Sequence, residues 1–434
     1  MTAANPQAVT EPVPAASGAA RQAAGLPRLL PPAPGVREDL EAHLARFGHL
    51  PRAGLSPTSL IDAAEQAGLT GRGGAAFPVY RKLAVVRRAR GRKVIVANGA
   101  ESEPASRKDA ALLWHAPHLV LDGLQMAAEA IGADQVYLYL HRGQEGKIAR
   151  ALHERTAAGL DRRGIVVTQA PPRFLAGQET ALVNRIEGGP ALPTFASPLV
   201  PERGIAVHNV ETLAHLALIA RYGPDWFRQV GTAAEPGTML ATIHRGGRPE
   251  VIEAPLGSQL STLLDHSGAA QAVLIGGYHG TWLPASAVDE NLTLDNRTLK
   301  RHGAALGAGV LAVLPGQVCG LREAARVTRY LAAESAGQCG PCLNGLPRIA
   351  AAMAELAGSR PRRKTREDTE RWAGLVTGRG ACHHPDGTVR FVRSALTVFA
   401  DELRRHATGR CSAPSSQPFL PLPDRMPMSE EDWI

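Results

Sequence analysis

The chain has 434 residues, of which 44% are hydrophobic and 4% aromatic, and its formal net charge is +8. This length exceeds what one hydrophobic core normally contains, so we expect two or three domains. The low aromatic content argues against a carbohydrate-binding or base-stacking surface. The basic residues are mostly Arg and are scattered rather than clustered, so the positive charge does not predict a nucleic-acid partner.

Membrane and secretion signals are missing from the sequence. No run reaches the ~20 apolar residues that a membrane span needs. The best candidate, residues 303–315, is short and Gly-rich and is typical of a buried strand with tight turns. The N-terminus has no cationic start followed by an apolar core, so we predict no signal peptide and a cytoplasmic chain. In that reducing setting the five Cys are expected to be ligands or buried thiols rather than disulfides.

The first half of the chain alternates predicted helices and strands. Residues 1–36 are rich in Ala, Pro, Gly and Gln, and we expect a disordered leader there. Apolar periodicity then predicts helices at 38–47, 59–67 and 116–132, and β-rich runs predict strands at 93–98, 135–140 and 164–168. This repetition favours an α/β domain over residues 37–235, with a parallel sheet whose ligands bind beyond the carboxyl ends of its strands.

The pattern changes near residue 236. Two predicted strands, 238–244 and 248–253, flank a Gly-Gly pair, which is a hairpin signal, and a helix at 260–264 and a strand at 272–275 follow. This order predicts a small β-grasp (ubiquitin-like) domain over residues 236–302. Helical patterns at 322–333, 347–357, 366–375 and 388–406 predict a helical domain of the four-helix-bundle type over residues 303–409. We expect the Pro/Ser-rich tail, residues 410–434, to be disordered.

A glycine-rich segment, residues 68–78, is the first candidate site. Its glycines and nearby basic side chains are the candidate phosphate ligands: Gly71, Arg72, Gly73, Gly74 and Lys82. Closely spaced glycines let backbone N–H groups turn towards one anion, and a helix that begins near Pro78 would add its positive end. A glycine-rich segment alone is also typical of a flexible turn.

Three further polar segments follow predicted strands or precede apolar helices. Residues 98–104 (NGAESEP) carry paired acids that can accept hydrogen bonds from ring N–H, ribose hydroxyl or amide groups. Residues 177–182 (GQETAL) and 208–212 (HNVET) are polar starts before apolar helices. Taken singly, a solvated acidic turn or a helix cap explains each of them.

The cysteines form a fifth signal. Cys339 and Cys342 are spaced C-x-x-C, and Cys382 lies downstream. This spacing fits an iron–sulfur cluster, because thiolates on one loop can bind adjacent iron corners. Zinc would want four N/S ligands, and His383 and His384 beside Cys382 leave zinc open. No strand precedes the pair, which disfavours a thioredoxin-type redox motif, and buried structural thiols are the remaining alternative.

Together and in this order, the five segments resemble the flavin-binding (F) subunit of bacterial NADH-quinone oxidoreductase, the entrance of respiratory complex I. The chain reads GRGGAAFPVYRK, NGAESEPASRKD, GQETAL, HNVETL and ESAGQCGPC, with a late Cys at 382. The family carries GRGGAGFPTG-x-K, NADESEP-x-x-x-KD, GEETAL, NNVETL and ESCG-x-C-x-x-C. The match covers residues 37–409 and implies an FMN-binding α/β domain, a β-grasp domain and a four-helix bundle that holds a [4Fe–4S] cluster.

The resemblance implies a role for each matched residue. The implied cofactor-binding residues are Gly71, Arg72, Gly73, Gly74, Phe77, Lys82, Asn98, Gln178, His208 and Asn209. The implied catalytic residues are Glu101, Glu103 and Glu179, and the implied cluster ligands are Cys339, Cys342 and Cys382. Phe77 would stack near the adenine of NADH, while Glu103 and Glu179 would orient it. Electrons would pass from NADH, or another reduced donor, through FMN and the cluster to an iron–sulfur partner subunit or a ferredoxin, in a complex at the periphery of the inner membrane.

The chain also departs from the family pattern. The altered positions are Leu83 (aromatic in the family), Ala100 (Asp), Gln178 (Glu), His208 (Asn) and Ala336 (the first cluster Cys). Losing two carboxylates makes the predicted flavin pocket less negative, which should raise the flavin potential and weaken NADH oxidation. Three thiolates leave one iron corner open, for water, Cys319 or His383.

Two other functions are compatible with parts of the pattern. A module like the C subunit of the Rnf electron-transport complex shares the glycine loop and the β-grasp domain. That family usually has AECEP and tandem C-x-x-C-x-x-C runs, and neither occurs in this sequence. A degenerate, non-catalytic scaffold that kept the fold and binds partner subunits is the third hypothesis. A flavin spectrum of the purified protein would separate the first two functions from the third.

Overall fold

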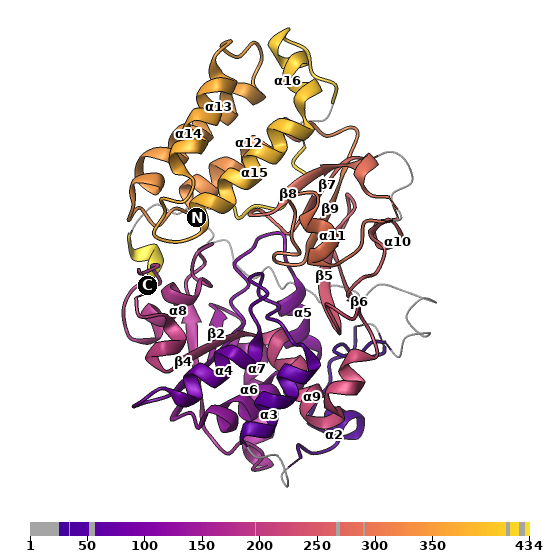
Figure 1. The fold of residues 1–434 in the computed structure, drawn as a ribbon, viewed down its shortest axis with the longest axis vertical. Coiled ribbons are helices and arrows are strands. Elements are labelled where there is room, and N and C mark those ends of the chain that lie inside the picture. Colours follow the sequence, from indigo (N-terminus) through magenta and orange to yellow (C-terminus); the bar gives the residue numbers. More distant parts are fainter. Residues whose placement is uncertain are drawn as a thin grey trace, which may run out of the picture.

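The computed structural model describes residues 26–33, 35–51, 57–195, 197–265, 270–289, 291–413, 417–424 and 430–434. Figure 1 shows an α/β region at one end of the long axis, a helical region at the other end, and a second sheet beside them. No helix in these described ranges is both long and apolar enough to cross a membrane. Most of the predicted leader, residues 1–25, lies outside the described residues.

A parallel sheet forms the centre of the α/β region, with the strand order β3-β2-β1-β4. Its strands are β1 (Val94–Asn98), β2 (Gln135–His141), β3 (Ile165–Ala170) and β4 (Ile205–Asn209). The central strand β1 is apolar on both faces and buried, as expected for a parallel sheet between two layers. The predicted parallel α/β architecture is therefore confirmed.

Helices cover both faces of this sheet. They are α2 (Leu40–Phe47), α3 (Pro57–Ala67), α4 (Val79–Arg88), α5 (Lys108–His115), α6 (Pro117–Ile131), α7 (Glu145–Ala157), α8 (Glu179–Ile186), η1 (Val200–Arg203) and α9 (Val210–Arg228). Helices α3, α4, α6 and α9 share a core with Ile95 and Leu138, whereas α8 packs with Val96 and Tyr139 on the opposite face. Successive strand residues point to opposite faces, so one strand supplies both cores.

A mixed sheet follows, with the order β6-β5-β9-β7-β8. Its elements are β5 (Thr238–His244), β6 (Glu250–Pro255), α10 (Leu260–Leu264), β7 (Ala270–Ile275), β8 (Thr281–Pro284), η2 (Ala285–Ala287), α11 (Asn296–Lys300) and β9 (Val310–Pro315). Strands β5 and β9 are parallel and the other neighbours are antiparallel. The sheet therefore extends to Pro315, beyond the predicted boundary at residue 302, because long-range pairing inserts β9 between β5 and β7.

The remaining helices pack together beyond β8. They are α12 (Gly320–Ala333), α13 (Leu346–Ala357), α14 (Thr365–Val376), α15 (His384–Val398) and α16 (Ala400–Ala407), with a short π-helical turn, η3 (Pro341–Gly345), before α13. The single helix predicted over 388–406 is broken at Phe399. The Phe399 ring occupies the space beside Gly320, where a Cβ would lie 2.2 Å from the ring.

The end of the leader is ordered, which differs from the expected disorder of residues 1–36. Leu29 is fully buried, and its backbone N–H donates to Glu253 Oε2 at 2.9 Å. The Arg28 guanidinium lies 4.0 Å from the centre of the Trp226 ring. Composition predicted disorder, but two consecutive leucines that enter the core are enough to hold this short segment.

Parts of the tail are packed as well, again unlike the expected disorder of residues 410–434. Leu420 is buried, and its N–H donates to Glu323 Oε2 at 3.0 Å. The last turn, η4 (Glu430–Trp433), reaches the α/β region, where the Trp433 carbonyl accepts from Ala191 N–H at 2.7 Å. The Arg173 guanidinium lies over the Trp433 ring. The described tail thus runs from the helical region back to the α/β region.

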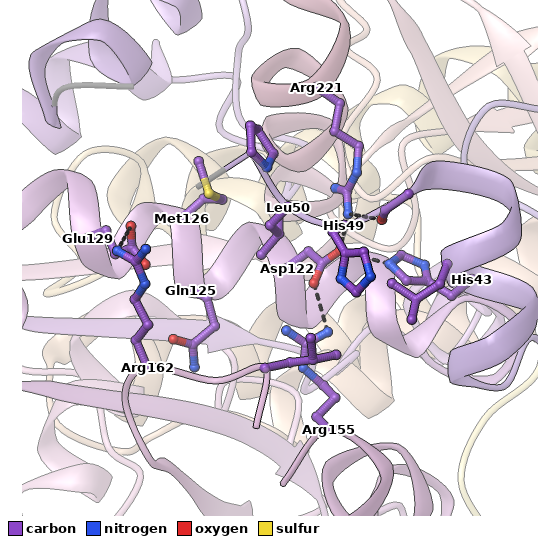
Figure 2. A pocket seen from close by; sticks show the side chains of 14 residues that line it. His43, His49, Leu50, Asp122, Gln125, Met126, Glu129, Arg155, Arg162 and Arg221 are labelled. Atoms are coloured by element: carbon purple, nitrogen blue, oxygen red, sulfur yellow. Dashed lines mark hydrogen bonds and ion pairs between the residues drawn. The ribbon is translucent and has the colours of Figure 1, made fainter. Parts of the chain in front are cut away.

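A buried charge network fastens α2 onto α6, and Figure 2 shows it around a small cavity of about 30 Å³. Asp122 accepts from Arg155 at 2.7 Å, from His43 at 2.8 Å and from Arg221. Burial alone would raise the pKa of Asp122, but the bond with His43 and the charge of Arg155 hold it well below its usual value. Residues from the glycine-rich segment and the strand ends do not line this cavity, so we interpret it as structural.

Candidate functional site

Separate segments of the sequence meet at the carboxyl edge of the parallel sheet. Strand β1 ends at Asn98, and its register partner on β4 is Asn209. Asn98 Nδ2 donates to the Gly177 carbonyl at 2.9 Å, and Asn98 Oδ1 accepts from Ala100 N–H at 3.2 Å. Gly177 N–H donates to Ser102 Oγ at 3.1 Å. These bonds join the loop after β1 to the loop before α8.

The glycine-rich loop, residues 71–77, lies against the same edge. Gly71 N–H donates to the Phe77 carbonyl at 2.9 Å, which makes the loop a compact turn before α4. A Cβ on Gly73 would lie 3.2 Å from Asn209 Cβ. Gly74 has a φ of +104°, and a Cβ there would lie 3.4 Å from the Gly307 carbonyl. The loop backbone can therefore lie close to Asn209 of the parallel sheet and to Gly307 beside the mixed sheet only because Gly73 and Gly74 have no side chains.

The loop also presents an aromatic ring to solvent. Ala76 has a φ of +49°, in the left-handed region that favours glycine. The next residue, Phe77, is 47% exposed. An exposed ring beside a backbone cradle is available for stacking, which is the role that the resemblance implies for Phe77.

Arg72 is placed differently from the predicted phosphate ligand. It is buried, its Nε donates to the Thr238 carbonyl at 3.2 Å, and its Nη2 donates to the Pro236 carbonyl at 3.3 Å. Its N–H donates to Thr212 Oγ1 at 2.8 Å. Burial lowers the pKa of Arg72, and the charge of Glu211 opposes this. Because its donors bind protein carbonyls, we interpret Arg72 as a residue that fixes the loop to the start of β5.

Lys82 and Glu179 form an ion pair at this edge. Lys82 Nζ lies 2.7 Å from Glu179 Oε1 and donates to the Val207 carbonyl at 3.0 Å. The side chains of Lys82 and Glu179 are 17% and 35% exposed. The pair therefore holds an ammonium group at the end of β4, within reach of solvent.

Two of the positions that are predicted to depart from the family pattern lie next to this pair. Gln178 caps α8, because its Oε1 accepts from the N–H groups of Thr180 and Ala181, each at 2.9 Å. His208 is buried, and its Nε2 has no hydrogen-bond partner among the described residues. Burial, reinforced by the charge of Lys82, lowers the pKa of His208 to about 3, so the ring is neutral at pH 7. Buried polar atoms are normally satisfied, so the orphaned nitrogen indicates a place where a ligand could bind.

Glu101, a predicted catalytic residue, caps a helix. Its Oε1 accepts from Asp109 N–H and its Oε2 from Ala110 N–H, both at 3.1 Å, at the start of α5. The Ser106 hydroxyl also donates to Glu101 Oε1, at 2.5 Å. A carboxylate at a helix N-terminus is stabilised by unpaired N–H groups and the helix dipole. Its bonds thus orient the loop after β1.

Glu103, the second predicted catalytic residue, bridges the two sheets. Its Oε2 accepts from Tyr278 N–H at 2.8 Å, in the turn between β7 and β8, and its Oε1 accepts from Ala105 N–H at 3.2 Å. A Cβ on Gly277 would lie 2.5 Å from Glu103 Oε2. Burial raises the pKa of Glu103 to about 7, although the two backbone N–H bonds act in the opposite direction.

A buried charge network lies next to these loops. In the sequence, its residues Lys108 and Asp109 were noticed only as the end of the segment NGAESEPASRKD. Lys108 Nζ donates to Asp109 Oδ1 at 2.6 Å and to Glu211 Oε2 at 2.9 Å, and Asn209 Nδ2 donates to Asp109 Oδ2 at 2.7 Å. Burial would lower the pKa of Lys108, but the carboxylates of Asp109 and Glu211 hold it above its usual value. Through the bond to Asp109, the network holds the Asn209 side chain next to Gly73. Sequence reasoning also missed Gly277 and Gly307, because their contacts cross between sheets and leave no local signal.

The three predicted cluster cysteines come together at the start of α13. Cys342 is buried in the π-helical turn, and Cys339 and Cys382 are half-buried. Burial raises the pKa of Cys342 to about 11, the hydroxyl of Ser335 opposes this by a hydrogen bond, and Cys339 and Cys382 raise it further. The influence of Cys339 and Cys382 on the Cys342 pKa places the three thiols in one neighbourhood, although their sulfur atoms are not all within 4.8 Å of one another.

The structure narrows the choice of a fourth ligand. The resemblance predicts that Ala336 stands where the family has its first cluster Cys. Cys319, a predicted candidate, lies instead beside His406, with its Sγ 3.6 Å from Nε2, at the opposite end of α12. The His383 side chain is fully exposed and its Nδ1 lies 4.0 Å from Asp386. The Ser335 hydroxyl, which hydrogen-bonds Cys342, was not considered from the sequence.

Comparison with known proteins identifies the family. The model of the Nuo51 FMN-binding domain matches residues 64–218, and that of the NADH-ubiquinone oxidoreductase-F iron-sulfur binding region matches residues 322–406. The F subunit of NADH-quinone oxidoreductase from Streptomyces coelicolor is 31% identical over 385 residues, which cover 82% of this chain and 84% of that protein. The chain belongs to this family. The corresponding F subunit from Escherichia coli K12 is 29% identical, and the match covers 80% of this chain and 84% of that protein.

A solved structure shares the architecture. The NAD+-reducing [NiFe]-hydrogenase in its H2-reduced state superimposes with a TM-score of 0.73 at 26% sequence identity, over 83% of this chain. The chain spans 64% of the hydrogenase chain. The fold of this chain is therefore shared with a second NAD-linked redox protein.

The described residues fit the cofactors of the family. The glycine-loop backbone, the ammonium group of Lys82 and the orphaned nitrogen of His208 suit a phosphate-bearing, hydrogen-bonding cofactor such as FMN. Cys339, Cys342 and Cys382 suit the [4Fe–4S] cluster. The chain is an electron-transfer flavoprotein subunit that carries electrons from NADH through FMN to an iron–sulfur cluster.

Proposed function

We propose that FMN binds at the carboxyl edge of the parallel sheet, with its phosphate against the backbone of Gly71, Gly73 and Gly74. The close approach of Gly73 to Asn209 is the observation that supports this proposal. Because Gly73 has no side chain, its backbone is available to a ligand at the ends of the strands. Asn209 would face the flavin with its amide already oriented by Asp109. FMN, when bound, accepts a hydride and releases its electrons singly.

The donor site lies on the exposed side of this cradle in our proposal. Phe77 offers a half-exposed ring for stacking, and Glu179 offers a carboxylate oxygen beside Lys82. Glu179 can therefore orient NADH, while Lys82 places positive charge next to the flavin. Glu101 and Glu103 bind backbone N–H groups, so we assign them to loop positioning rather than to contact with the reacting atoms.

Electrons leave through the cluster on Cys339, Cys342 and Cys382 in this proposal. The mixed sheet, as a β-grasp unit, would hold this helical bundle against the flavin domain, since Glu103 bonds the turn after β7. The relatives are named as subunits, which supports a redox complex with an iron–sulfur partner subunit or a ferredoxin as acceptor. We further propose that the altered residues Ala100 and Gln178 make NADH oxidation slower than the family pattern would allow.

Anaerobic titration of the full chain, reconstituted with FMN, tests the flavin site. Adding NADH should bleach the flavin absorbance. In Lys82→Gln, FMN should bind about tenfold more weakly, because one charge-assisted contact is lost. Lys300→Gln on α11, which alters an exposed lysine, is the matched control and should bind like the unaltered chain. A colourless chain that takes up neither FMN nor iron would instead favour the scaffold hypothesis.

A further inference from the structure

A second group of metal-ligating side chains lies in the helical region. Cys319, Glu402, His406 and Cys411 converge so that their ligating atoms all lie within 4.8 Å of one another. Cys319 precedes α12, Glu402 and His406 lie one turn apart on α16, and Cys411 lies at the start of the tail. Cys319, Glu402 and His406 are buried and Cys411 is half-buried. Two segments that are distant in sequence, residue 319 and residues 402–411, therefore meet at one point.

This group is separate from the predicted cluster. Cys319 is the N-cap of α12, whereas the cluster loop begins after the C-terminal end of that helix. A helix of 14 residues is about 21 Å long at 1.5 Å per residue. Likewise, His406 bonds the carbonyl of Leu356 at the end of α13, while Cys342 precedes the start of α13. The two groups lie at opposite ends of the same pair of helices.

The separations fit a tetrahedral metal. Cys319 Sγ lies 3.6 Å from His406 Nε2, and His406 Nε2 lies 3.2 Å from Glu402 Oε1. Ligand bonds of about 2.0–2.3 Å to zinc give tetrahedral edges of about 3.3–3.8 Å. One ion can therefore contact these atoms with little movement of the side chains.

The hydrogen bonds around the group leave two acceptors facing each other. His406 Nδ1 lies 3.1 Å from the Leu356 carbonyl, which can only accept, so Nδ1 carries a hydrogen, and in the neutral ring Nε2 then carries a lone pair. Glu402 accepts from Ser412 N–H at 2.9 Å and from the Ser412 hydroxyl at 2.5 Å, which indicates a carboxylate. The Nε2 lone pair and the Glu402 oxygen repel each other unless a cation or an extra proton lies between them.

We propose that Cys319, Glu402, His406 and Cys411 bind one Zn²⁺ ion. Two thiolates, one imidazole and one carboxylate form a closed set of four ligands, each of a type that binds zinc. The Leu356 carbonyl and Ser412 are the outer partners that orient His406 and Glu402. Binding converts both thiols to thiolates and releases their two protons to solvent. The half-buried Cys411 gives the ion a path of entry.

The ion would fix the start of the tail to the bundle. Cys411 is followed by the buried Ala413, and the tail continues to Leu420, whose N–H is bound by Glu323 of α12. Metal–ligand bonds would join α16 and residue 411 to Cys319 at the start of α12. Zinc therefore stabilises the bundle end that lies away from the redox sites.

Zinc analysis of the full chain, expressed with zinc and purified under reducing conditions, tests the proposal. We expect about one zinc per chain, and zinc-edge X-ray absorption should show two sulfur ligands at about 2.3 Å and two N/O ligands at about 2.0–2.1 Å. Cys411→Ser and His406→Gln should each lower zinc affinity by about tenfold or more. The exposed-residue variant His153→Gln on α7 should bind zinc like the unaltered chain.

Zinc bound at the predicted cluster cysteines must be distinguished from zinc bound at the proposed site. In the double variant Cys339→Ser, Cys342→Ser, the proposal requires the zinc content to stay at about one per chain. The flavin content of the same variant reports separately whether the chain has folded. Zinc that is lost with the cluster cysteines and kept in Cys411→Ser would overturn the proposal. So would a chain without zinc under these conditions, or a Cys319–Cys411 disulfide found by thiol counting in the denatured, reductant-free protein.

Discussion

The two redox sites differ in how much of their geometry exists before a cofactor binds. At the sheet edge, Asn98, Glu101 and Glu103 are each held by backbone groups at 2.8–3.2 Å. At the cysteine loop, the Cys342 thiol hydrogen-bonds the Ser335 hydroxyl, and the resemblance predicts that Ala336 stands at the first ligand position. The sheet edge is preorganised by the fold, whereas the predicted cluster site at the cysteine loop has only three of the four thiols that the family pattern implies. Damage at the edge should therefore remove a cofactor, while a fourth thiol at the loop should stabilise one.

Gly73→Val should give the largest effect, because it breaks the preorganised edge. A Cβ at residue 73 would already lie 3.2 Å from Asn209 Cβ, and two further methyl groups must displace Asn209 or the loop. We expect FMN occupancy to fall by more than about tenfold. Occupancy is measured as flavin absorbance per protein after purification.

Gly146→Val is the matched control for this substitution. Gly146 lies on α7, where a Cβ meets nothing within 4 Å, so Val is accommodated there. Its flavin content should equal that of the unaltered chain, and circular dichroism should show both variants folded. If Gly73→Val is folded and keeps its full flavin, the glycine loop is only a turn.

Ala336→Cys should give the next largest effect by completing the weaker site. The unaltered chain, reconstituted anaerobically with iron and sulfide and then oxidised, should show the EPR signal of a three-iron cluster that adds ferrous iron. The variant should keep a four-iron cluster, because a fourth thiolate closes the open corner. Ala354→Cys adds a thiol on the exposed side of α13 and should change nothing. Iron at background in every protein would show that the three cysteines have no cluster role.

The contrast also explains how far the sequence could predict the molecule. The parallel sheet and most helices were predictable, because apolar periodicity and the strand-end polar residues, such as Asn98 and Asn209, are local signals. The place of β9 and the contacts of Gly277 and Gly307 were not, because they depend on pairing between distant segments. The ordered tail was missed because a few residues such as Trp433 outweigh an otherwise polar composition.

At the site, the sequence predicted which residues gather but not what each one does. Arg72 and Glu103 were expected to face cofactor or substrate, yet both bond backbone groups that join the two sheets. A charged residue that binds a carbonyl or an amide looks, in sequence, like one that binds a ligand. Conversely, the ion pair between Lys82 and Glu179 could not be predicted from the sequence, because 97 residues separate the two partners.

The double variant Ala100→Asp, Gln178→Glu should sharpen the comparison with a moderate gain. Glu at 178 can still cap α8 with one oxygen, as Gln178 does, while it adds negative charge near Lys82. We expect NADH-driven dye reduction to rise by about threefold to tenfold, a barrier change of about 1 kcal/mol. Gln229→Glu, on the exposed end of α9, adds one negative charge away from the site and is the surface control. No gain over this control would mean that the altered carboxylates do not limit NADH oxidation.

Glu103→Gln should give the smallest effect, visible as a change in the pH dependence of stability. Folding raises the pKa of Glu103 from its ordinary 4.5 to about 7, mainly by burial. The folded chain therefore binds more protons than the unfolded chain between these values. Its stability from this group is fully present below pH 4.5 and is lost as the pH rises through about 7.

The amide of Glu103→Gln can still accept from Tyr278 N–H but does not titrate, so the variant should lack this loss. Relative to the variant, the unaltered chain should become less stable by about 1–2 kcal/mol between pH 5 and pH 8, because the folded chain must give up a proton that it holds more tightly than the unfolded chain. Denaturant titrations at each pH measure the difference, with the exposed Glu367→Gln on α14 as control. Parallel pH profiles for the chain and Glu103→Gln would show that the bridge between the sheets carries no titrating charge. A divergence over this range would show that the preorganised edge keeps a carboxylate whose charge costs stability, as expected of a buried residue that joins the two sheets.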